Sequence, residues 1–219
     1  MSAVVGYNLN TNGLQLYLDA RNPTSYPGSG NTWYDLSPNN NNSTLTGTSY
    51  TTASGALNFN GTSSKGTFSS PTNIPINNSN YTISVWFNAT STGGAKGFIG
   101  WGTYGTINRV NALRIGGSSF VHYWWGNDIA GGAFVANAWY QVTVTYDGYW
   151  RRLYVNGGLA AQDIPGNGHA VPNANNLTIG VTNGTEFFPG KLSQILVYNT
   201  AISYSEVVNN YYATNYRYS

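Results

Sequence analysis

The stretch that decides the fold of this chain runs from Leu177 to Val207. It reads Leu177-Thr-Ile-Gly180 and, further along, Phe188-Pro-Gly-Lys-Leu-Ser-Gln-Ile-Leu-Val-Tyr-Asn-Thr-Ala-Ile-Ser-Tyr-Ser-Glu-Val207. This pattern predicts a strand, a turn at Gly190, and a second strand over residues 192–198. Ser203, with Glu206 three residues later, has the spacing of a capping box, so we expect a short helix over about 203–213.

Two earlier segments alternate apolar and polar residues, as half-buried strands do. Residues 81–88 are apolar at odd positions, and residues 139–146 place Tyr140, Val142, Val144 and Tyr146 on one face. The pairs Asp147-Gly148 and Asn156-Gly157 are tight-turn signals, and such short connections predict antiparallel hairpins. Further strands are expected at 14–18, 57–61, 98–101, 112–115, 120–125 and 152–155, with a solvated turn at 39–42.

Many short strands with one helix predict an all-β chain. The expected architecture is a two-sheet antiparallel β-sandwich with one short C-terminal helix. No internal repeat or linker is visible, so residues 13–213 are interpreted as one domain, preceded by an N-terminal arm (1–12) and followed by a C-terminal tail (214–219).

Several segments, taken in order, resemble the laminin-G-like / concanavalin A-like lectin-glucanase jelly-roll family. They are residues 57–61, 81–86, 139–148, 153–157, 177–180 and 190–207, so the likeness extends over nearly the whole chain. The resemblance implies a jelly roll. It also implies a surface-binding role, because most members are binding modules and a minority are glycan hydrolases.

The opening segment, residues 16–36, carries a narrower resemblance. Leu16-Tyr-Leu-Asp-Ala-Arg-Asn-Pro-Thr-Ser-Tyr-Pro-Gly-Ser-Gly-Asn-Thr-Trp-Tyr-Asp-Leu36 is similar to a version of this domain found in structural and tail-associated proteins of tailed bacteriophages and other large DNA viruses. This likeness implies capsid or tail proteins as partners and a place on the virion surface. Decorating proteins of this kind are often dimers or trimers, so a homo-oligomer is one expected assembly.

Composition narrows the function classes. Charged residues make up 7% of the chain, the net charge is +2, and there is no cysteine. The cations are scattered, which argues against nucleic acid as a partner, and disulfides and thiolate metal sites are excluded. The N-terminus lacks the basic segment and the apolar segment of a secretory signal, so we expect synthesis in a host cytoplasm. No apolar run is long enough to span a bilayer, so we expect no membrane insertion.

No catalytic residues can be assigned from the sequence. The chain has seven carboxylates, and the closest two are sixteen residues apart, as Asp19 and Asp35 are. No single strand can therefore present the paired carboxyl groups that a retaining glycosidase needs. Of the two histidines, His122 is expected to pack within a strand and His169 to face solvent. A non-enzyme is predicted.

One stretch supplies the residue types that bind sugars, namely aromatic faces with amide and carboxylate groups. Because Trp124 and Trp125 are adjacent on a predicted strand, they point to opposite faces, and one should reach a surface. The alternative is that both close the sandwich or meet a neighbouring subunit. The candidate ligand residues are Trp101, Tyr104, Arg109, Trp124, Trp125, Asn127 and Asp128.

Two further expectations concern a metal and a partner surface. The family resemblance makes Ca²⁺ a candidate cofactor, with Asp128 or Asp147 as single acidic ligands, but no metal site is readable and none is assigned. Tyr211, Tyr212, Tyr216 and Tyr218 near the C-terminal end are a candidate docking surface, together with residues 1–12. The alternative is that they cover the sandwich edge.

The leading hypothesis is thus a non-enzymatic virion decoration protein of a capsid or tail that binds host-surface glycan. The alternative is a free-standing lectin-like carbohydrate-binding protein. A glycan hydrolase is disfavoured by the carboxylate spacing.

Overall fold

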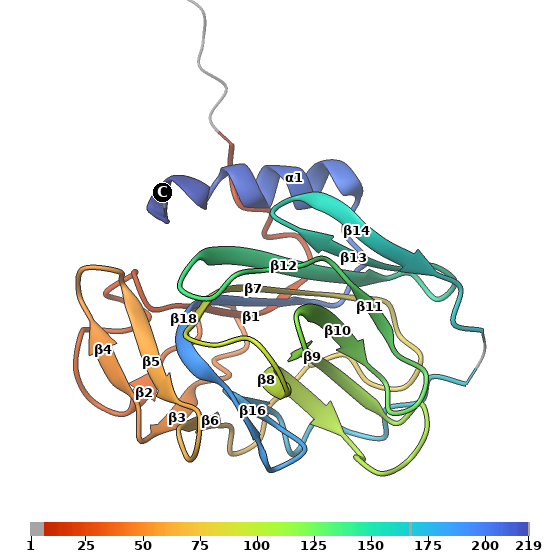
Figure 1. Ribbon diagram of the computed structural model, residues 1–219, viewed down its shortest axis with the longest axis horizontal. Coiled ribbons are helices and arrows are strands. Elements are labelled where there is room, and N and C mark those ends of the chain that lie inside the picture. Colours follow the sequence, from red (N-terminus) through yellow and green to blue (C-terminus); the bar gives the residue numbers. More distant parts are fainter. Residues whose placement is uncertain (1–6, 167, 219) are drawn as a thin grey trace, which may run out of the picture.

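The structure is a computed structural model that describes residues 7–166 and 168–218. Two antiparallel sheets pack face to face (Figure 1), which confirms the predicted all-β sandwich. The first sheet has the order β14-β13-β12-β7-β18-β5-β4, with β1 also paired to β18. Its strands are β1 (Leu14–Asp19), β4 (Ser49–Thr51), β5 (Ala56–Asn60), β7 (Tyr81–Ala89), β12 (Trp139–Tyr146), β13 (Arg151–Val155), β14 (Gly158–Asp163) and β18 (Pro189–Tyr198).

The second sheet has the order β11-β10-β9-β8-β15-β6-β3-β2. Its strands are β2 (Thr32–Trp33), β3 (Ser43–Thr46), β6 (Lys65–Thr67), β8 (Ala95–Gly102), β9 (Val110–Gly116), β10 (Ser119–Tyr123), β11 (Ile129–Gly131) and β15 (Thr178–Ile179). A small hairpin of β16 (Val181–Thr182) and β17 (Glu186–Phe187) lies beside β8.

Alternation along the strands fills the space between the sheets. The odd residues of β7, from Tyr81 to Phe87, pack with Val142, Val144 and Tyr146 of β12 in the main core. The hairpin meander β12–β13–β14 turns at residues 147–150 and 156–157, as the Asp-Gly and Asn-Gly pairs predict. Side-chain periodicity and turn chemistry therefore account for most of the architecture.

The C-terminal segment covers the outer face of the first sheet. Helix α1 (Tyr204–Tyr212) is N-capped by Ser203, whose side chain and that of Glu206 make the reciprocal bonds of the predicted capping box. The 3-10 turn η1 (Asn215–Arg217) follows it. Figure 1 shows α1 on the side of β12, β7 and β18 that faces away from β8–β10. In residues 7–166 and 168–218, neither helical segment has the length and apolar character of a membrane span.

Trp86 anchors this cover, although it occupies an even, outward position of β7. Its indole Nε1 donates to Thr214 Oγ1 at 2.9 Å, and its ring stacks on Tyr218 and Tyr211 with centroids 4.2 and 5.7 Å away. Tyr211 and Tyr218 are half-buried with their rings packed on the sheet, which is the arrangement that the edge-covering alternative expects, and their docking role stays a prediction. Tyr212 and Tyr216 remain exposed, at 45% and 69%. Residues 1–6 of the expected arm lie outside the described residues.

Gly190 does not form the expected turn. Strand β18 passes through it, and the chain reverses instead at residues 183–185, between β16 and β17. Gly190 has a φ of 147°, and a Cβ there would overlap the carbonyl oxygen of Asn88 on the paired strand β7. A glycine is needed here because two backbones approach too closely for a side chain.

Candidate functional site

Two of the candidate ligand residues lie in the core. Trp101 and Trp124 have no exposed surface. Trp101 donates its Nε1–H to the carbonyl of Pro75 at 2.9 Å, and Trp124 donates to the Tyr81 hydroxyl at 3.0 Å. The prediction that Trp101 and Trp124 bind a ligand at the surface is wrong, because a fully buried ring cannot contact a sugar.

Tyr104 and Trp125 do meet, on the outer face of the second sheet. Their ring centroids are 6.3 Å apart, and Tyr123 stands 5.5 Å from Trp125 and 6.4 Å from Tyr104. We call these three side chains the aromatic platform. Tyr104 and Trp125 are half-buried, whereas Tyr123 is nearly covered. The platform packs on a small apolar cluster formed by Val110, Ala112 and Val121 beneath it.

Small residues on β8 and β9 make room for the platform. Gly100 is paired with Ala112, and a Cβ on Gly100 would overlap the Tyr104 hydroxyl. Burial raises the pKa of Tyr104 and raises that of Tyr123 to about 12, so both rings stay neutral at physiological pH. The platform is thus uncharged.

Arg114 closes one side of the platform. Its guanidinium lies 3.6 Å above the Tyr123 ring centroid and pairs with Glu186 at 2.6 Å. Glu186 in turn accepts a hydrogen bond from Thr182 Oγ1, so the β16–β17 hairpin is fixed beside the platform. Because the cation and the carboxylate cancel, this side offers hydrogen-bonding groups without net charge.

A turn over residues 124–128 presents Trp125. The Trp124 N–H donates to Asp128 Oδ1 at 2.9 Å, and Arg151 Nη1 donates to the Asn127 carbonyl at 2.8 Å. Trp125 itself has a φ of 66°, a conformation that bulky residues rarely adopt. Asp128 and Asn127 therefore shape the turn. Arg109 is exposed and donates to the carbonyl of Ala170 at 3.1 Å, which is a peripheral position.

A pocket of about 220 Å³ with a mixed polar and apolar lining adjoins the platform. Tyr104 forms one wall of it and Phe187 another, and the other lining residues are Lys65, Asn176, Thr178, Val181, Asn183 and Gly184. Aromatic walls with amide, hydroxyl and ammonium groups are the chemistry that recognises a polyhydroxylated ring.

A row of threonines leads away from this pocket across the sheet. Thr178, Thr67, Thr44 and Thr32 are direct partners on neighbouring strands, and Thr178 is also paired with Gly100 under the platform. They share the outer face, because Leu45 and Ile179 on the same strands point into the core. Adjacent strands lie about 4.8 Å apart, so the row is a regular series of hydroxyl groups.

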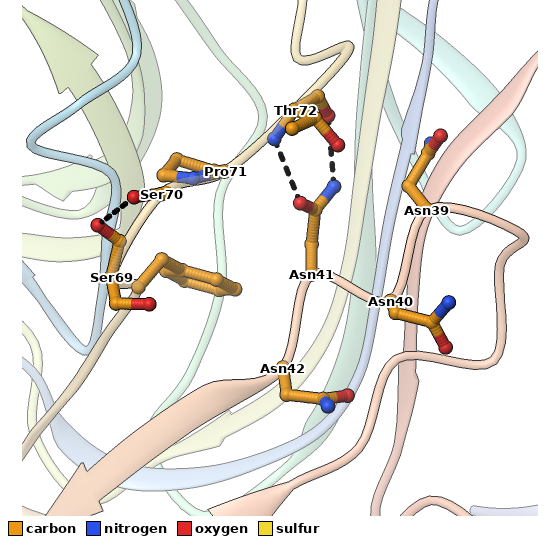
Figure 2. A pocket seen from close by; sticks show the side chains of 9 residues that line it. Asn39, Asn40, Asn41, Asn42, Ser69, Ser70, Pro71 and Thr72 are labelled. Carbon is orange, nitrogen blue, oxygen red and sulfur yellow. Dashed lines mark hydrogen bonds between the residues drawn. The ribbon is translucent and has the colours of Figure 1, made fainter.

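A separate pocket of about 210 Å³ lies between residues 39–42 and 68–72 (Figure 2). Asn41 is only 5% exposed, and its amide makes two hydrogen bonds with the Thr72 backbone, at 2.8 and 2.9 Å. The buried Asp35 carboxylate also accepts the Asn41 N–H at 2.8 Å. The expectation of a solvated turn is wrong at Asn41, because its amide replaces a missing backbone partner.

The carboxylates are engaged in structural contacts. Asp19, Asp147, Asp163 and Glu186 pair with arginines, and Asp35, Asp128 and Glu206 accept backbone hydrogen bonds. Both oxygens of Asp147 are taken, by two N–H groups and Arg152. Across residues 7–166 and 168–218, no three His, Asp or Glu side chains are placed to hold a metal ion. Calcium takes about six to eight oxygen ligands, backbone carbonyls and waters among them, and both Asp147 oxygens already serve the β12–β13 turn and Arg152.

Sequence reasoning missed Tyr123, Arg114, Thr182 and Glu186. Tyr123 had a usable signal, because a strand over 120–125, as expected from the sequence, would place it on the same face as Trp125, two residues away. The other three come from strands and a hairpin distant in sequence, and only the fold brings them to the platform.

Comparison with protein families gives one match. A model described as the concanavalin A-like lectin/glucanases superfamily matches residues 60–208. Curated protein sequences show no significant similarity to this chain.

Several solved structures share the fold. Trypanosoma rangeli sialidase has a TM-score of 0.73 and 17% identity over 99% of this chain, which spans 35% of the sialidase chain. The binding domain of Paraclostridial Mosquitocidal Protein 1 has a TM-score of 0.71 and 17% identity, with 91% of this chain and 52% of that chain covered. Domain 4 of a GH43 extracellular arabinanase from Geobacillus stearothermophilus, in complex with arabinotriose, has a TM-score of 0.69 and 16% identity, with 90% and 97% covered. At such identities the likeness shows the fold.

Proposed function

The chain belongs to the concanavalin A-like lectin/glucanase superfamily, and from this premise we propose that it is a non-enzymatic carbohydrate-binding domain. Its ligand site is the aromatic platform of Tyr104, Tyr123 and Trp125 with the adjoining pocket. The arabinanase domain, which was solved with arabinotriose, supports a glycan ligand on this fold.

The observation that carries this proposal is the placement of Trp125. A bulky residue in the left-handed region costs on the order of 1–3 kcal/mol, and such strain persists where the surroundings enforce it, often at ligand sites. Here the strained backbone turns a half-buried indole beside two neutral aromatic rings. Aromatic faces without net charge suit the apolar face of a sugar ring, and the threonine row supplies hydroxyl groups for further units of a linear chain.

Replacing Trp125 with Ala is expected to weaken glycan binding. A central aromatic anchor contributes about 2 kcal/mol, so the Kd should rise roughly 30-fold. The measurement is titration calorimetry with the best ligand from an array of neutral oligosaccharides that includes arabinotriose. Trp125 and its alanine replacement both carry a Cβ, so the backbone strain at this position is unchanged.

Trp150→Ala is the matched control, because Trp150 is also partly exposed but lies on the β12–β13 turn. It should leave the Kd within about twofold, since it is outside the site. A folded Trp125→Ala protein that binds as tightly as the parent would rule out the platform. A parent protein that binds no glycan on the array would remove the proposed function itself.

The non-enzymatic part of the proposal is supported by the carboxylates. Retaining glycosidases need two carboxyl groups about 5 Å apart with one free to act as nucleophile. In this chain the carboxylates are tied into ion pairs, a helix cap and turns. The neutral platform therefore has binding groups beside it rather than an acid–base pair.

We also propose that the domain serves on the surface of a virus particle, docked on capsid or tail proteins. The opening segment, residues 16–36, supports this through its resemblance to phage structural proteins. The exposed pair Tyr7 and Tyr212, stacked with centroids 5.0 Å apart, supplies an apolar contact on the α1 side. Docking there would leave the platform, on the opposite sheet, open to a host glycan.

The substitution Tyr212→Ser is expected to reduce the number of copies that co-sediment with purified particles several-fold. Tyr and Trp side chains contribute strongly to such contacts. Tyr204→Ser is the control, because Tyr204 is exposed on the same helix at 59%. Equal incorporation of both variants would remove α1 as the docking surface, and absence of the parent protein from particles would refute the virion role.

A further inference from the structure

A pocket of about 430 Å³ lies beside the 3-10 turn η1, on the side of the first sheet. It is lined by Arg21, Asn22, Tyr216 and Arg217. The pocket is separate from the aromatic platform, which lies on the outer face of the second sheet. It brings together two of the nine cationic residues in a chain where charged residues make up only 7%.

The charges in this pocket do not cancel. Arg217 Nη1 pairs with Asp19 Oδ2 at 2.6 Å. The Asp19 carboxylate is buried and also accepts the backbone N–H of Arg21 at 3.0 Å and the amide of Gln194 at 3.2 Å. The Arg21 guanidinium instead donates to the backbone carbonyl of Arg217, which is neutral. Within the described part of the chain, Arg21 makes no ion pair, so the pocket keeps one net positive charge.

Arg21 is held in place at both ends. Its stem lies flat on the turn at Gly55, where φ is +57° and a Cβ would come within 2.5 Å of Arg21 Cγ. The carbonyl of Arg217 fixes the guanidinium end. A pre-ordered arginine loses little conformational entropy when it binds, so its remaining N–H donors are available to a ligand at low cost.

The lining selects the chemistry of the ligand. Planar guanidinium groups bind carboxylates through paired hydrogen bonds. Tyr216 adds an aromatic wall that is 69% exposed, and Asn22 adds a polar amide. We propose that this pocket binds the carboxylate of an acidic sugar, with the sugar ring against Tyr216. The domain would then hold a neutral glycan on one face and a uronic or sialic acid type of residue on the other.

The test is NMR titration of the full chain with a glucuronate-containing disaccharide, with its methyl ester, and with inorganic phosphate. The acid should bind, with shifts confined to residues around Arg21 and Arg217. The ester should bind at least about tenfold more weakly, because it keeps the ring and loses the charge. No binding of the acid at millimolar concentration would overturn the proposal, and phosphate binding as tightly as the acid would reduce the pocket to a general anion site.

Arg21→Gln keeps the Cβ and Cγ that pack on Gly55 and removes the guanidinium. We expect at least about a tenfold rise in the Kd for the acid. Lys96→Gln removes the same charge elsewhere, on β8, and should change the Kd less than about twofold. Tyr216→Ser should weaken the binding of the acidic disaccharide, although it leaves the net charge of the protein unchanged. Equal effects of Arg21→Gln and Lys96→Gln would overturn the proposal, because they would indicate overall charge rather than a site.

The variant Trp125→Ala distinguishes binding at this pocket from glycan binding at the aromatic platform, which is the proposed function. It should leave the Kd for the acidic sugar unchanged, while it raises the Kd for the neutral glycan roughly 30-fold. Loss of both activities in a folded Trp125→Ala protein would contradict an independent acidic-sugar pocket.

Discussion

Trp124→Ala is expected to lower the free energy of unfolding by about 3–5 kcal/mol, the range for deleting a buried tryptophan. The indole has no exposed surface and stacks on His169 with ring centroids 3.7 Å apart. It also donates to Tyr81 and lies 4.2 Å under the Arg151 guanidinium. Alanine would leave a cavity next to a buried cation. The measurement is denaturant unfolding, and the melting temperature should fall on the order of 10 °C.

Trp125→Ala is the internal control for this experiment. The two tryptophans are adjacent in sequence, but Trp125 is half-buried on the outer face and Trp124 is in the core. Trp125→Ala should cost less than half as much stability, while it weakens glycan binding of the folded protein roughly 30-fold. Equal losses of stability in the two variants would contradict the assignment of Trp124 to the core.

Stability should fall on mild acidification, by about 2 kcal/mol between pH 7 and pH 5 from His169 alone, and His122 adds to this loss in the same direction. The chain has two histidines, and both are buried. Burial, together with the Arg151 charge, lowers the pKa of His169 to about 3 and holds the pKa of His122 well below its usual value. In the unfolded chain each histidine titrates near 6.5.

The direction of this pH dependence follows from the number of protons that the folded and unfolded states bind. Between pH 6.5 and about 3, the unfolded state binds up to one more proton at His169 than the folded state does, so stability rises with pH across this window, and the lowered pKa of His122 acts in the same direction. The His169 contribution to the free energy of unfolding is nearly complete at pH 7 and is lost as the pH falls through 6.5, by up to about 1.4 kcal/mol per pH unit. The interval from pH 7 to pH 5 spans the pKa of about 6.5 at which histidine titrates in the unfolded chain.

His169→Phe is the control for the acid effect. Phenylalanine keeps an aromatic ring against Trp124 and removes one titrating group. The slope of the unfolding free energy against pH, measured in urea at several pH values, should become smaller, because the His169 contribution is removed and that of His122 remains. A flat profile in the parent between pH 7 and pH 5, or an unchanged slope in the variant, would contradict the neutral buried pair.

His169 also shows what local sequence could not predict. Its loop, Pro-Gly-Asn-Gly-His, suggests exposure, yet the ring is 3% exposed and stacked on Trp124, forty-five positions earlier. The contact depends on where β10 and the loop before β15 meet in space. His122, in contrast, was expected to pack within its strand, and its alternation on β10 confirms this.

The sequence likewise predicted one part of the candidate site and left another part undecided. The strand expected over 120–125 predicted that Trp124 and Trp125 face opposite sides, and this is confirmed, although β10 ends at Tyr123 and both residues lie in the turn that follows it. The same pattern could not tell which side is the interior, because that depends on which face of β10 meets the first sheet. The ligand role of Trp125, Tyr104, Arg109, Asn127 and Asp128 stays a prediction, as does the division into arm, domain and tail.

By itself the sequence determined the elements of this protein. Period-two alternation in β7 and β12, the Asp-Gly and Asn-Gly turns, and the Ser203–Glu206 capping box are local, because each depends on residues a few positions apart. Only the tertiary structure decided how these elements are covered. Trp86, Tyr211 and Tyr218 stack on the outer face of the first sheet, and Gly190 lets two strands approach. Burial is a property of neighbours, and those neighbours come from segments that lie far apart in the chain.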